Sequence, residues 1–152
     1  MVLGTFLVSG KTKLVFKSLF SPKLGPLTGA PAARRLKIYS ARTGWVYQYA
    51  YEGHRPYRQA RAETGIEFVF SVSTGRKTRR PVSVFLADAS LGAWEHKHRR
   101  TLTATERYAV AKMALFLAFD ERANPALLKQ DVRVRPADVE AILETLGIEP
   151  EE

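Results

Sequence analysis

The densest apolar stretch of the chain, Tyr108–Phe119, predicts the central helix of the fold. Just before it, Thr103 and Glu106 have the spacing of a capping box, in which a hydroxyl and a carboxylate satisfy free amides at a helix start. Asn124–Pro125 follows as a stop signal. We therefore expect a helix over residues 104–121. It should be buried on more than one side, because apolar positions surround it almost completely.

Short strands and a loop are predicted ahead of this helix. Leu36–Ser40 is β-like, and Trp45–Tyr51 places four aromatic residues on one face, which is typical of a strand. Glu52–Thr64 is polar, rich in arginine and interrupted by Pro56, so we expect a loop there. The aromatic face has two interpretations: an open platform for stacking bases, or the core face under the helix. We favour the core, because the opposite face is small and partly polar.

A hairpin should follow this loop. Ile66–Ser73 and Val82–Ala87 both alternate between apolar and polar residues. A slip of one residue would turn an apolar face to solvent, so Phe70 must pair with Val82 or Val84. Either register leaves a cluster of basic residues at the exposed tip.

Two shorter helices are predicted around the central one. Asp88 is the expected cap of the first, and Pro136 and Gly147 bracket the second. Val132 and Val134 alternate with arginines, as in a short edge strand. The predicted fold is α+β. It is an antiparallel meander of three to five strands over about 36–87, packed on one face by C-terminal helices at about 89–98, 104–121 and 137–146.

Charge divides the chain unevenly. The net charge is +9 over 152 residues, no acid precedes Glu52, and residues 101–152 are net negative. We expect a flexible basic arm at 1–35 and a single domain at 36–152. An organelle transit peptide and a start codon placed too early are open alternatives for the arm. The expected location is cytoplasmic without membrane association, because the order of apolar and basic residues does not fit a secretory signal.

The basic residues concentrate in the two predicted loops. Lysine and arginine neutralise backbone phosphates, so a basic loop is a candidate contact for nucleic acid. We therefore expect a small non-enzymatic protein that binds DNA or RNA. The alternative is an interaction or regulatory subunit that buries its apolar main helix against a protein partner or a second copy. The candidate nucleic-acid-binding residues are Arg55, Arg58, Arg61, Arg76, Lys77, Arg79 and Arg80.

Sequence motifs for catalysis, a metal or a cofactor were not found. His96 and His98 would point about 200° apart on a helix and cannot share a metal. The Gly-Lys-Thr triplet after Ser9 lacks the spacing of a phosphate loop. Lys112 is the one charge inside the apolar helix. It is either a buried amine of lowered pKa or, as we favour, a packed stem whose amine reaches solvent. An enzyme with scattered site residues is a third hypothesis, and Lys112 or His54 would then line its pocket.

Overall fold

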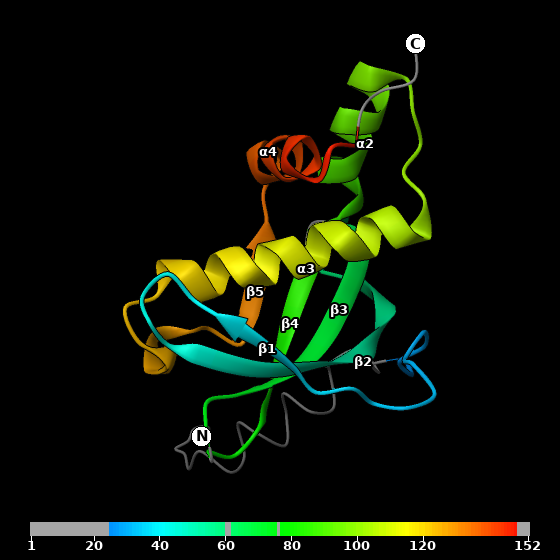
Figure 1. Ribbon diagram of the computed structural model, residues 1–152. Coiled ribbons are helices and arrows are strands. Elements are labelled where there is room, and N and C mark those ends of the chain that lie inside the picture. Colours follow the sequence, from blue (N-terminus) through cyan, green and yellow to red (C-terminus); the bar gives the residue numbers. More distant parts are fainter. Residues whose placement is uncertain (1–24, 60–61, 76, 149–152) are drawn as a thin grey trace, which may run out of the picture.

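Five strands form one sheet in the order β1-β2-β3-β4-β5 in the computed structural model, which describes residues 25–59, 62–75 and 77–148 (Figure 1). The strands are β1 (Lys37–Ser40), β2 (Val46–Arg58), β3 (Thr64–Ser73), β4 (Arg80–Ala87) and β5 (Asp131–Val134). The helical segments are α2 (Asp88–His98), α3 (Ala104–Glu121), the 3-10 turn η2 (Pro125–Leu127) and α4 (Pro136–Leu146).

The predicted α+β architecture is confirmed. Strands β1 to β4 form an antiparallel meander, and Phe70 pairs with Val82, one of the two registers that the apolar pattern allows. Strand β5 runs parallel to β4. The reason is the path of α3, which begins near the end of β4 and crosses the sheet (Figure 1). A helix of 18 residues is about 27 Å long, so it returns the chain to the opposite end of the sheet.

The central helix has the predicted bounds. The side chain of Thr103 accepts a hydrogen bond from the amide of Glu106, and Glu106 accepts one from the amide of Thr103, so the capping box is present. Its stripe of Ala111, Ala114 and Ala118 is buried. The helix contacts β4 and β5 on one side and α4 on the other. Both bulky faces of α3 therefore have a packing partner within one chain, although Leu117 stays exposed.

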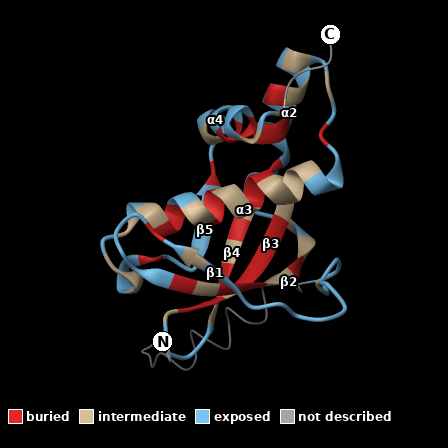
Figure 2. Cartoon of the chain, in the orientation of Figure 1, coloured by how far each residue is buried: buried red, intermediate tan, exposed pale blue. Residues whose placement is uncertain are grey.

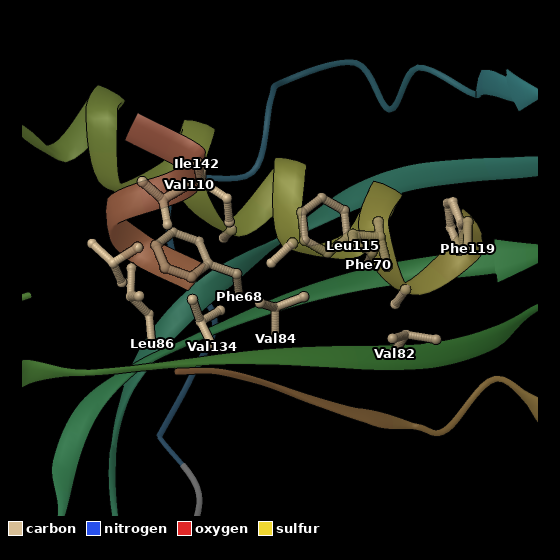
Figure 3. Packing of buried hydrophobic residues seen from close by; sticks show 14 of the residues in the cluster. Phe68, Phe70, Val82, Val84, Leu86, Val110, Leu115, Phe119, Val134 and Ile142 are labelled. Atoms are coloured by element: carbon tan, nitrogen blue, oxygen red, sulfur yellow. The ribbon is translucent and has the colours of Figure 1, made fainter. Parts of the chain in front are cut away.

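The aromatic face of β2 is the core face, as favoured. Tyr47 and Tyr49 are buried, and the ring of Tyr47 stacks on that of Phe119 with centroids 4.1 Å apart. Figure 3 shows strand residues such as Phe70 facing Leu115 and Phe119 of the helix. Trp45 differs, because it is half-exposed and its indole N–H donates to a backbone carbonyl. Buried positions concentrate on β3 and β4, whereas β1 at the sheet edge is exposed (Figure 2).

The predicted loop over Glu52–Thr64 is wrong. Strand β2 continues to Arg58, and β3 begins at Thr64. A β-bulge at residues 52–53, where Gly53 has φ +123°, shifts the register between the two strands. A bulge adds one residue to one strand and so breaks the alternation that identifies a strand in the sequence.

Pro56 also misled the prediction, although a proline is tolerated at the edge of a sheet. The amide of His54 donates outward, to the carbonyl of Thr28 at 2.8 Å. Backbone amides alternate in direction along a strand, so the nitrogen of Pro56 also faces this outer edge. A missing donor there costs no bond to β3.

Two smaller corrections concern segment ends. Asp88 does not cap α2: the N-cap is Ala87, and the carboxylate of Asp88 instead accepts a hydrogen bond from Thr64 at 2.8 Å. Residues 25–35 belong to the predicted flexible arm, but Thr28 and Arg34 of this segment contact β2. Thr28 forms a β-bridge with His54. The packed chain therefore begins before residue 36, and residues 1–24 lie outside the described part.

Candidate nucleic-acid interface

The two basic segments expected to bind nucleic acid lie at opposite ends of the sheet. The β2–β3 turn is beside the first residue of β3, and the β3–β4 turn follows its last residue. Strand β3 has ten residues, and at about 3.3 Å per residue it separates the two turns by about 30 Å. The structure therefore does not bring the predicted residues together into one patch.

The predicted contact residues also differ in whether another group of the protein already binds their charged side chain. Arg55 is half-buried, with its Nε 2.8 Å from a carboxylate oxygen of Glu67. Arg80 donates to the carbonyl of Pro125 at 3.0 Å. Arg58, Lys77 and Arg79 are exposed, and none has an acidic partner among the described residues. Arg61 and Arg76 lie outside the described residues.

A cleft that the sequence did not reveal lies between these ends. We name it the β2–α3 cleft; it has a volume of about 690 Å³, within the range of roughly 300–1,000 Å³ typical of ligand sites. One wall is the segment from Gly29 to Lys37, and the other is the start of α3. Strands β2 and β3 lie between them. The lining residues are Gly29, Pro31, Arg35, Lys37, Tyr49, Tyr51, His54, Ile66, Phe68, Leu102, Ala104, Thr105, Arg107 and Tyr108.

His54 is held in this cleft by two neighbours. Because the bulge reverses which residues face the helix, Tyr51 and His54 share one face, and the Tyr51 hydroxyl lies 2.9 Å from His54 Nδ1. The hydroxyl of Thr28 lies 3.5 Å from Nε2. A Cβ on Gly29, whose φ is +79°, would come within 2.6 Å of the His54 ring. Glycine therefore lets the outer wall approach the imidazole closely.

Half-buried rings form part of the lining. The rings of Tyr51 and Tyr108 are 4.7 Å apart between centroids, and both are partly exposed. Burial, with a smaller contribution from Tyr108, raises the pKa of Tyr51 to about 12. Burial also raises the pKa of Tyr108. Both hydroxyls therefore stay protonated near neutral pH, and that of Tyr51 can donate to His54.

Basic side chains line the same cleft. Arg35 and Lys37 are exposed on the outer wall, without an acidic partner among the described residues. Arg107 lies 3.6 Å from Glu95 through Nη2, while its buried Nε has no hydrogen-bond partner in the described structure. All the lining residues are described, and none is an aspartate or glutamate. The cleft is therefore electropositive.

Lys112 extends this charge along α3. Its stem is half-buried, and its amine lies 5.8 Å from the ring centroid of Phe116. Burial lowers the pKa of Lys112, and the charge of neighbouring Lys37 lowers it further. Both interpretations offered by the sequence therefore hold in part, since the stem packs and the pKa is lowered. Two like charges face each other here, so an anion between them would be stabilised.

The start of α3 adds a further positive element. Ala104 and Thr105 line the cleft at the first two positions of the helix. The amides of Ala104 and Thr105 have no acceptor within the helix, and the helix dipole places partial positive charge there. The capping box offsets part of this charge, because Thr103 accepts from the Glu106 amide and the Glu106 carboxylate lies at the same end.

Other candidate sites give less support to a function. Within residues 25–59, 62–75 and 77–148, no cluster of histidine and acidic residues could hold a metal ion. His98 lies 3.2 Å from Glu140, where it helps join α2 to α4. Asp120, near the end of α3, accepts hydrogen bonds from the Tyr39 hydroxyl and the Arg42 amide. None of the described helices combines the length and the apolar character needed to cross a membrane.

No family model, curated protein or solved structure matches this chain. The function must therefore be inferred from the chemistry of the β2–α3 cleft. Sequence reasoning missed it because its residues come from four separate segments, none of which carries a motif. The available signal was partial: Tyr51 and His54 belonged to a stretch where rings and arginines interleave.

Proposed function

We propose that this protein binds nucleic acid, with the β2–α3 cleft as the central contact and the exposed basic turns as outlying contacts to the backbone. The observation that carries the proposal is the cleft lining, which joins partly exposed rings to basic side chains and contains no carboxylate. Proteins that bind nucleic acid combine these two features, because bases stack on rings while basic side chains neutralise phosphates.

The charge distribution supports the same proposal. Lys77 and Arg79 at the β3–β4 turn and Arg58 at the end of β2 are exposed and without an acidic partner among the described residues. The basic residues that do pair with acids include Lys97, which lies 3.3 Å from Glu140, and Glu140 belongs to the net-negative segment 101–152. A polyanion would be attracted to the unpaired basic side chains more strongly than to those already balanced by an acid.

The alternative, a subunit that buries its main helix against a partner, loses its chief argument. That hypothesis rested on the strongly apolar central helix, which could complete its burial against another chain. The sheet and α4 cover both faces, and Leu117 is the large apolar residue of α3 that stays exposed. We therefore propose nucleic-acid binding rather than the interaction subunit.

Fluorescence anisotropy with labelled DNA and RNA oligonucleotides, titrated with salt, tests the proposal. We expect log K to fall linearly with log salt concentration, because each phosphate contact releases counterions. Lys77→Ala/Arg79→Ala should weaken binding and reduce the slope by about 0.7 per lost contact on a single strand. Lys97→Ala is the matched control, since Glu140 already balances its charge. Absence of binding at low salt to both DNA and RNA would remove the proposal.

A further inference from the structure

We infer that the β2–α3 cleft receives one unpaired nucleotide, so that the protein selects single-stranded over double-stranded nucleic acid. This inference rests on the proposed function and specifies the substrate of the same site. It follows from three properties of the cleft: its size, the position of its partly exposed rings, and the arrangement of its cations on two walls.

The floor of the cleft suits a flat aromatic group. Phe68 and Tyr49 are buried beneath it, whereas Tyr51, His54 and Tyr108 keep part of their surface exposed. Tyr51 and His54 are linked by the 2.9 Å contact between hydroxyl and imidazole, which fixes the two rings relative to each other. A base that enters would find ring faces that are already in place and would lose little side-chain freedom by ordering them.

The walls suit a phosphate group. Arg35 and Lys37 project from the outer wall. Arg107 comes from the first turns of α3 on the opposite wall, where Glu95 balances part of its charge but its Nε has no hydrogen-bond partner in the described structure. Lys112 lies close enough to Lys37 for the two charges to repel. A phosphate beside Arg35 and Lys37 would meet the outer-wall cations and would reduce the repulsion between Lys37 and Lys112. Rings between cationic walls therefore match a base and its attached phosphate.

Single strands fit this arrangement better than duplexes. In a duplex the ring faces of the bases are occupied by stacking, and a protein reaches only their edges in the grooves. An unpaired base can turn out of the strand and stack on an aromatic side chain. A volume of about 690 Å³ accommodates a small-molecule-sized group rather than a helix with two strands.

The test compares the wild type and two double variants against three probes. The probes are an oligothymidine of about 12 nucleotides, the duplex of the same length, and thymidine monophosphate. Arg35→Ala/Lys37→Ala removes the outer-wall cations, which are exposed, so the fold should survive. Lys77→Ala/Arg79→Ala removes the same charge at the distant β3–β4 turn. We expect the wild type to bind the single strand on the order of tenfold more tightly than the duplex.

The pattern across variants separates this inference from the proposed function. The outer-wall variant should lose most of the preference for the single strand and all measurable binding of the monophosphate. The β3–β4 turn variant should weaken both oligonucleotides equally. If neither oligonucleotide binds the wild type, the proposed function fails and the inference with it. If both bind the wild type equally and the outer-wall variant keeps that ratio, the inference fails while the function stands.

Tyr108 provides an independent test of stacking. Tyr108→Phe keeps the ring and should bind the single strand like the wild type. Tyr108→Leu keeps an apolar side chain but removes the ring, and should weaken single-strand binding on the order of tenfold, with little change for the duplex. Circular dichroism and the urea midpoint establish that both variants are folded. Equal affinity of the two folded variants for the single strand would contradict a stacked base.

Discussion

The bulge at Gly53 determines how the outer wall of the β2–α3 cleft attaches to the sheet. Gly53 has φ +123°, where a residue with a side chain is strained by about 1–3 kcal/mol. A Cβ added there would lie 2.8 Å from the carbonyl oxygen of Thr28. The obstacle is backbone, so a side-chain rotation cannot relieve the contact. Gly53→Ala should therefore push the segment containing Thr28 away from β2.

The cost can be worked from the contacts that would be lost. Thr28 and His54 exchange two backbone hydrogen bonds, of 2.9 and 2.8 Å. Each contributes about 0.5–1.5 kcal/mol net. Strain and lost hydrogen bonds together predict that Gly53→Ala lowers the free energy of unfolding by about 2–6 kcal/mol.

Urea unfolding followed by circular dichroism measures this loss. With a slope of about 2 kcal/mol per molar urea, a loss of about 4 kcal/mol lowers the midpoint by about 2 M. Gly92→Ala is the matched control, because Gly92 is exposed on α2 and an added Cβ there meets open space. It should stabilise the protein by about 0.5–1 kcal/mol. An unchanged midpoint for Gly53→Ala, beside the expected gain for Gly92→Ala, would refute this account of the bulge.

Two further predictions concern the core and a polar cluster on the other face of the sheet. Leu115→Ala should destabilise by about 2–5 kcal/mol in the same assay, because Leu115 is fully buried between helix and sheet. Glu67→Gln should cost about 3 kcal/mol, because it leaves the Arg55 charge without its partner. Burial alone would raise the pKa of Glu67, but hydrogen bonds from Arg55 and Ser83 and the Arg55 charge outweigh it and hold the pKa below its ordinary value of 4.5. The ionised carboxylate therefore stabilises the fold fully above pH 4.5, and this contribution is lost as the pH falls through the lowered pKa. Unfolding measured against pH should show that Glu67→Gln lacks this loss, and a variant with the acid sensitivity of the wild type would contradict the assignment.

The elements that the sequence predicted well are those whose signals are local. The capping box at Thr103 and Glu106 and the apolar run after it defined α3, and Gly147 marked the end of α4 in a left-handed conformation. The need to bury one face of each strand limited Phe70 to Val82 or Val84, and the structure pairs it with Val82. Each of these inferences depends on residues within one element or on two adjacent elements.

The continuation of β2 could not be predicted, because its signals are not local. The bulge at Gly53 reverses the alternation in the middle of the strand, and Pro56 is acceptable only because its nitrogen faces the sheet edge. The parallel direction of β5 depends on the path of α3 across the sheet. The alternation of a short segment does not indicate whether it runs parallel or antiparallel to the neighbouring strand.

The β2–α3 cleft is the feature that could least be predicted from the sequence. Arg35 precedes the first strand and Lys37 begins it, His54 follows the bulge, and Tyr108 belongs to the helix. Only the folded chain shows that they share one lining. The sequence also could not show that Arg55, one of the residues predicted to bind nucleic acid, pairs its charge with Glu67 inside the protein.

The most direct test of the central claim is an NMR titration of the protein with oligothymidine. We predict that the resonances of Tyr51, His54 and Tyr108 shift together with those of Arg35 and Lys37, saturating with one binding curve. Shifts confined to the exposed turns at the two ends of the sheet, or no shifts at low salt, would contradict the claim that the cleft is where nucleic acid binds.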